Sequence, residues 1–95
     1  NKDKGVSNMK AVLTVIGKDS VGIMAKVSAS CAEQNANILE VTQSILDGYF
    51  CMVMVIDISK LNCELHELSG KVQASVPEMQ IHVMHEDIFN SMHRI

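Results

Sequence analysis

Aromatic residues and proline are scarce in this sequence. Its 95 residues include one tyrosine, two phenylalanines, one proline and no tryptophan. RNA-recognition modules stack bases on aromatic side chains of a sheet, so this scarcity argues against such a module. The net charge of −3 argues against nucleic-acid binding more generally, because nucleic-acid surfaces are usually basic. We therefore expect no nucleic acid among the partners.

Long apolar runs are also missing. The longest, Tyr49 to Ile56, falls far short of the roughly 18 residues that a membrane-spanning helix needs. Residues 1–8 are polar and lack the apolar core of a signal peptide. We interpret them as a leader or tag remnant outside the fold, and expect a cytoplasmic protein that does not interact with membranes.

Cysteine and histidine patterns that would indicate a structural bridge or a metal site are absent. The three cysteines are odd in number and show no CxxC spacing, which argues against a disulfide framework. His82 and His85 are three residues apart, so within a strand they would point to opposite faces. A zinc site normally needs four close ligands. We expect neither a metal ion nor another cofactor.

Catalytic patterns are equally hard to find. Ser20, Ser28 and Ser30 have no histidine nearby in the sequence to act as a base. An acylphosphatase-like enzyme would need an arginine cradle for phosphate, but Arg94, the one arginine, stands in the tail. We expect a protein that is not an enzyme.

What is present is the pattern of one small domain, residues 9–95. Apolar residues make up 47% of the chain. A strand is predicted over 10–16, then a helix with Ile23, Val27 and Cys31 on one face, then a half-exposed strand that contains Leu39, Val41 and Ile45. Further along, the patterns predict a hairpin turn at 47–48, a strand over 49–58, a helix over about 62–76, a strand over 79–86 and a short amphipathic tail.

This order predicts an α+β, ferredoxin-like βαββαβ sandwich. Its four-stranded antiparallel sheet would have the first and third strands at the centre, two helices on one face and a short C-terminal helical tail. The third strand is apolar on both faces, although the helices cover only one of them. An exposed apolar patch of that size is rare on a monomer, so we expect a homodimer.

The stretch GKDSVG, residues 17–22, lies where the first strand gives way to the first helix. Ser20 or Asp19 could cap the helix, and Gly22 would let a ligand approach its free amides. Those amides favour a carboxylate or phosphate, with help from Lys18, while Asp19 could bind an amine. A zwitterion would use both charges. The alternative is an ordinary capped turn.

The pattern of an apolar strand, KDSVGI, a helix and NANI resembles the ACT domain, a regulatory module that senses amino acids and related metabolites. Across residues 9–95 the chain is similar to small stand-alone bacterial ACT proteins of unsettled function, most specifically in the ending HEDIFNSMHRI. Its first half also resembles the amino-terminal ACT domain of the glycine cleavage system transcriptional repressor.

The resemblance implies roles at matching positions. Asp19 matches a loop position that contacts ligand, and Gly22 matches the position that lets the helix start approach it. Asn37, followed by Ile38, matches an asparagine that contacts ligand across a subunit interface. Val21 stands where many ligand-binding members have proline. With Lys18, Ser20 and Ile23, these residues form the expected ligand site.

Two functions follow from these expectations. The first is a regulatory module that binds a small amino-acid-like metabolite near a dimer interface and passes its signal to an unidentified protein partner. The alternative is a protein-interaction or dimerisation module that binds no metabolite.

Overall fold

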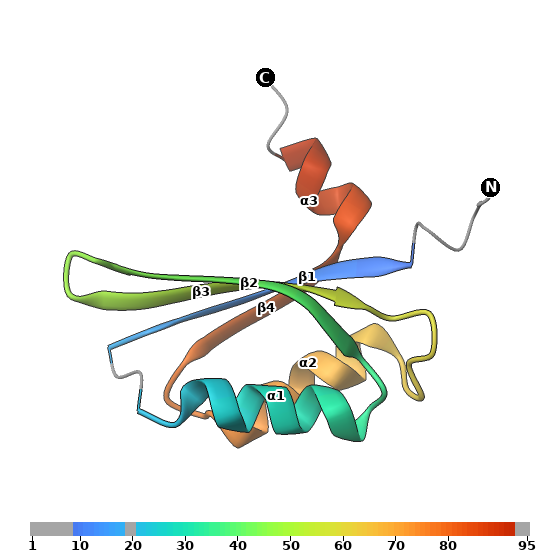
Figure 1. The fold of residues 1–95 in the computed structure, drawn as a ribbon, viewed down its shortest axis with the longest axis horizontal. Helices are drawn as coiled ribbons and strands as arrows, with labels where there is room; N and C mark the ends of the chain where they lie inside the picture. The colour runs from blue at the N-terminus through green and yellow to red at the C-terminus, as the bar shows by residue number, and fades with distance from the viewer. Residues whose placement is uncertain (1–8, 19–20, 93–95) are drawn as a thin grey trace.

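A four-stranded antiparallel sheet forms one layer of the molecule, and two helices form the other (Figure 1). The structure is a computed structural model that describes residues 9–18 and 21–92. Its elements, in chain order, are β1 (Lys10–Gly17), α1 (Ile23–Glu33), β2 (Asn37–Leu46), β3 (Tyr49–Asp57), α2 (Leu65–Ser75), β4 (Gln80–His85) and α3 (Glu86–Met92).

The strand order is β2-β3-β1-β4, which confirms the predicted ferredoxin-like arrangement. β1 and β3 occupy the centre, and they pair from Lys10 opposite Asp57 to Gly17 opposite Phe50. Helices α1 and α2 lie on one face of this sheet, and the short α3 lies on the other (Figure 1).

The core lies between the sheet and the two helices. Alternate residues of the central strands are buried there, because successive side chains of a strand point to opposite faces. The fully buried side chains from these strands and from α1 and α2 include Leu13, Val15, Ile23, Val27, Cys31, Met52, Met54, Ile56, Leu68 and Val72. Ala36, between α1 and β2, belongs to the same cluster.

The opposite face of the sheet, which we call the open face, is only partly covered. α3 packs mainly against β1 and β4, and Val12 on this face is 2% exposed. Cys51, Val53 and Val55 of β3 lie on the same face and are half-buried. The sequence predicts apolar residues on both faces of this strand, and the described residues leave the row on the open face partly in contact with solvent.

Both helix starts differ from prediction. We placed the cap of the first helix at Ser20 or Asp19, but the cap residue of α1 is Gly22. The second helix was expected from about Asn62, but α2 begins at Leu65. The reason is local, since the Glu64 N–H donates a 2.8 Å hydrogen bond to Oε1 of Glu67, which fixes the start of α2 there.

Two turns behave as their residue types predict. Asp47 and Gly48 both have positive φ, at 54° and 82°, as a type I′ hairpin between β2 and β3 requires. Asn35 has φ 62° after the end of α1. There the Ala36 N–H donates to the Cys31 carbonyl and the Asn35 N–H to the Ala32 carbonyl, which is the Schellman pattern.

One feature of β2 was not foreseen. A β-bulge separates Ile38, which pairs with Ile56, from Glu40, which pairs with Val55. Leu39 is therefore unpaired and 42% exposed, whereas Ile38 and Val41 pack against the core. The expectation that Leu39 shares a face with Val41 was wrong, because a bulge inserts one residue into the alternation.

Candidate functional site

The junction of β1 and α1 is the first part of the candidate site. β1 ends at Gly17 and α1 begins at Ile23, whose side chain is buried. Gly22 caps the helix with φ 73° and ψ 0°, a left-handed conformation that glycine adopts without steric cost. Two expected site residues, Asp19 and Ser20, lie outside the described residues.

Among the described residues, no side-chain cap and no acidic residue of the first turn offsets the positive end of α1. Gly22 has no side chain with which to cap the helix, and the first turn contains no acidic residue. The first amides of a helix lack partners inside it and carry a partial positive charge. A carboxylate that reached Gly22 and Ile23 would meet backbone donors next to a residue that has no side chain.

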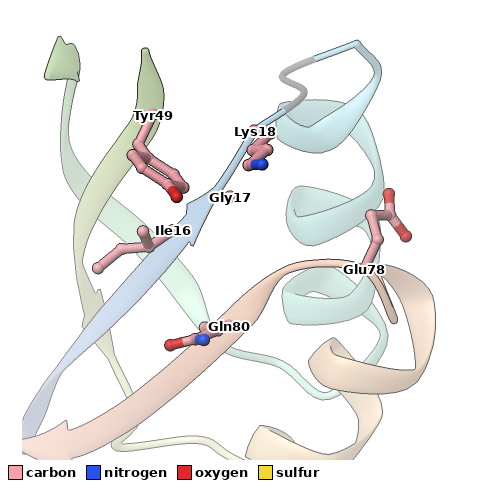
Figure 2. Close-up of a pocket in the computed structure, with 6 residues that line it drawn as sticks. All are labelled: Ile16, Gly17, Lys18, Tyr49, Glu78 and Gln80. Carbon is pink, nitrogen blue, oxygen red and sulfur yellow. The ribbon is translucent and has the colours of Figure 1, made fainter. Parts of the chain in front are cut away.

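An open pocket of about 620 Å³ lies beside the same end of β1 (Figure 2). It is lined by Ile16, Gly17, Lys18, Tyr49, Glu78 and Gln80. These residues come from the end of β1, the start of β3, and the connection from α2 into β4. The pocket therefore includes Lys18 of the expected site together with residues far away in the sequence.

The pocket combines charge with an apolar wall. Lys18 Nζ lies 5.9 Å from the centroid of the Tyr49 ring, within the range of a cation–π interaction. The Ile16 and Tyr49 side chains are 39% and 44% exposed, so both present apolar surface to a ligand. Glu78 supplies the opposite charge.

Strand pairing explains why these residues meet. Ile16 pairs with Gln80 across β1 and β4, on the open face. Tyr49 directly follows the hairpin turn, next to the Gly17–Phe50 pair. Sequence reasoning missed Tyr49, Glu78 and Gln80, because only the register of the folded sheet sets them beside Lys18. The one available signal was a tyrosine next to a hairpin turn in a chain with few aromatics.

Asn37 and Ile38 lie at the other end of the sheet. Asn37 pairs with Asp57, and Asp57 pairs with Lys10 at the start of β1. The seven residue-to-residue steps from Lys10 to Gly17 correspond to about 23 Å at strand rise. The fold therefore does not bring Asn37 to the β1–α1 junction within one chain, and contact with a ligand there would require a second copy.

Hydrogen bonding at the Asn37 end involves a neighbouring carboxylate. Oδ1 of Asp57 accepts a 2.8 Å hydrogen bond from the Ser59 N–H. This bond, more than the charges of nearby lysines, lowers the pKa of Asp57 from its ordinary value of 3.8. A small pocket of about 230 Å³ is lined here by Asn35, Asn37, Asp57, Ser59 and Lys60.

Within residues 9–18 and 21–92, the structure contains no group of three or more His, Cys, Asp or Glu side chains that could hold a metal ion.

Burial raises the pKa of the Cys31 thiol. No helix in the described parts of the chain is long and apolar enough to span a membrane.

Residues 10–86 match the family model of the ACT domain. The chain belongs to the ACT domain family. A UPF0237 protein of Listeria innocua is 51% identical over 89 residues, which cover 92% of this chain and all of the Listeria protein. The resemblance to small stand-alone ACT proteins is thus confirmed.

Solved structures agree with this assignment. An ACT domain protein from Streptococcus pneumoniae superposes with a TM-score of 0.74 at 36% identity, covering 90% of this chain and 98% of that one. A putative glycine cleavage system transcriptional repressor gives a TM-score of 0.66 at 14% identity, covering 78% of this chain and 44% of that one. This second likeness concerns the fold alone. ACT domains are regulatory modules that often bind ligands and typically dimerise.

Proposed function

We propose that this ACT protein is a non-enzymatic regulatory module that binds a small amino-acid-like metabolite at the β1–α1 junction, near an interface between two copies of the chain. The observation that carries the proposal is the start of α1. There the cap residue, Gly22, is left-handed and has no side chain to bond the first amides, in a family whose members often bind ligands.

The proposed binding mode uses both charges of the metabolite. Its carboxylate lies on the amides around Gly22 and Ile23, with support from Lys18. Its amine lies near Asp19 of the same chain and Asn37 of a second copy. Because Asn37 is at the far end of its own sheet, the complete site needs both copies.

The first test is a thermal-shift screen of the amino acids against the intact protein. A ligand that binds only the folded state raises the melting temperature, with a stabilisation of RT ln(1 + [L]/Kd). A concentration-dependent shift with one amino acid, or a few related ones, is the expected result. If no amino acid shifts the melt, the proposal fails.

Variants then locate the ligand. Asp19→Ala should weaken binding by about 1–3 kcal/mol, the effect of losing a charged hydrogen bond. Gly22→Asn should block the approach to the amides with a side chain. Asparagine is chosen because it tolerates a left-handed backbone, whereas a β-branched residue such as valine would be strained there. Glu33→Ala, at the exposed far end of α1, is the matched control. Wild-type affinity in both site variants would place the ligand elsewhere.

The alternative is a dimerisation or interaction module without a metabolite. The half-buried row Cys51, Val53 and Val55 on the open face favours it, because apolar surface in contact with water promotes association. A dimer in light scattering combined with a flat thermal-shift screen would support this alternative over the first proposal.

A further inference from the structure

We propose that the groove between α1 and α2 binds the phosphate group of a small phosphorylated metabolite. The groove has a volume of about 480 Å³ and is lined by residues of these two helices alone. Its lining includes none of the residues of the proposed site at the β1–α1 junction. Either site can therefore exist without the other.

The first observation is a buried hydroxyl without a partner. Ser30 of α1 is 8% exposed and lines the groove. Its hydroxyl makes no hydrogen bond within the described residues. Across the groove, by contrast, the Ser75 hydroxyl donates a 2.7 Å hydrogen bond to the Val72 carbonyl. Buried polar groups nearly always have a partner, so the Ser30 hydroxyl is a donor available to a ligand oxygen.

The second observation is a pair of lysines, one from each helix. Lys26 of α1 and Lys71 of α2 are exposed and both line the groove. The two helices run in opposite directions and lie side by side (Figure 1). Among the described residues, neither lysine has a carboxylate within 4.0 Å. A lysine ammonium is a common partner of phosphate, and two of them neutralise a dianion.

The arrangement of donors favours phosphate over a carboxylate. Lys26, Lys71 and Ser30 supply three separate donors, and a phosphate group offers three oxygens to receive them. Glu33 also lines the groove, one turn after Ser30, and its charge repels an anion. Two positive charges against one negative still leave the groove positive, in a chain whose net charge is −3.

Small side chains make the space for the ligand. Ala29 and Ala74 are the remaining lining residues, and both are exposed. The volume of about 480 Å³ is within the usual range for small-molecule pockets. A water molecule occupies about 30 Å³ of liquid, so the groove has room for a phosphate group together with an organic part.

Three probes test the ligand chemistry: glycerol phosphate, inorganic phosphate and glycerol. Each is titrated into the isotopically labelled intact protein at constant pH and ionic strength, and backbone amide chemical shifts are followed. Glycerol phosphate should shift the amides of Ser30 and Ser75 saturably, whereas glycerol should not. Tighter binding of glycerol phosphate than of inorganic phosphate would support a metabolite ester. Equal affinity would keep the phosphate site but overturn the ester.

Charge variants test the lysine pair. Lys26→Met and Lys71→Met should each weaken the binding of glycerol phosphate about tenfold, because each removes a charged hydrogen bond. Glu33→Gln should strengthen it about threefold, an effect typical of one exposed charge. Lys10→Met is the matched control. It removes a lysine at the start of β1, outside the groove, and should retain the wild-type affinity.

Ser30→Ala separates a ligand-binding hydroxyl from a structural one. Without ligand, this variant should melt at a higher temperature than the wild type, because it removes an unsatisfied hydroxyl and alanine favours a helix. It should nevertheless bind glycerol phosphate about fivefold more weakly, as expected for one lost hydrogen bond. A lower melting temperature with unchanged affinity would show that Ser30 serves the fold and would overturn its role in the site.

Two further results would contradict the groove. The absence of saturable shifts with both phosphate probes would leave no phosphate site. Lys26 is one turn after Gly22, so a phosphate could instead lie at the start of α1. That location predicts loss of binding in Gly22→Asn and none in Lys71→Met. An amino acid that still shifts the melt of Lys71→Met would show that the metabolite site at the β1–α1 junction is separate, whatever the outcome with phosphate.

Discussion

The side chain of Met79 packs directly against the α-carbon of Gly17. A Cβ built on Gly17 would lie 2.6 Å from Met79 Cε and even closer to Met79 Sδ, and real Cβ atoms do not approach heavy atoms so closely. Met79 itself is 3% exposed. A side chain at Gly17 would therefore force the end of the buried Met79 side chain to move within the core.

Gly17→Ala should therefore destabilise the protein by about 1–3 kcal/mol, the usual cost of overpacking a core. Denaturant unfolding is the measurement. The cost should shrink in the background of Met79→Ala, because the two residues touch and their effects are not additive. An equal loss of unfolding free energy in both backgrounds would show that the Gly17–Met79 contact is not the cause of the destabilisation.

Gly22 and Gly70 should respond to alanine in opposite directions. Gly22→Ala should cost about 1–2 kcal/mol, since an L-residue is strained at φ 73° even where space is free. Gly70→Ala should add about 1 kcal/mol of stability, because Gly70 is inside α2 and nothing lies within 4 Å of its Cβ position. Melting of the two variants beside the wild type checks both signs, and a stabilised Gly22→Ala would contradict the cap geometry.

Asp57 should make the protein less stable in acid. In the folded protein the pKa of Asp57 is lowered below 3.8. The stability that the ionised carboxylate contributes is therefore present above the unfolded pKa, and it is lost as pH falls through the lower folded pKa. Asp57→Asn should reduce stability at neutral pH and flatten the pH dependence below about pH 4. Unfolding measured from neutral to acid pH in both proteins provides the test. Parallel curves would exclude a role for the Ser59–Asp57 hydrogen bond.

Cys31 should be the slowest of the three cysteines to react with a thiol reagent. It is fully buried and burial raises its pKa, whereas Cys51 and Cys63 are half-buried. The thiolate is the reactive form, so both accessibility and ionisation protect Cys31. Timed alkylation followed by mass spectrometry should show Cys31 labelled last, at the rate at which the protein unfolds. Denaturant should abolish the difference, which controls for intrinsic reactivity.

A dimer that buries the open face should be sensitive to charge placed on it. Val53→Lys, in the middle of the β3 row, should convert the expected homodimer to a monomer in light scattering. Glu33→Lys, on the helix side, is the control and should leave the mass unchanged. Deletion of residues 87–95 should expose apolar surface and promote aggregation. A wild-type monomer at high protein concentration would refute the dimer.

The elements and their order were largely readable from the chain, because they depend on local chemistry. Apolar periodicity predicted the helices and strands, and Asp47-Gly48 predicted the hairpin. The helix starts were misplaced, since the choice among several possible caps depends on which amides the surrounding fold leaves free. The bulge at Leu39 was also invisible, because it exists only relative to a partner strand.

The sequence by itself determined the fold class, and it also placed the glycines and the helix start of the β1–α1 junction within a few residues of each other. Tertiary structure alone decided which distant residues share a site. Pairing of Ile16 with Gln80 set the open-face pocket, and the hairpin placed Tyr49 over it. The same pairing put Asn37 at the opposite end of the sheet. The sequence lists which side chains are available, but it does not show which of them become neighbours on adjacent strands. That depends on the strand register, which is set by burying one face of each strand in the core.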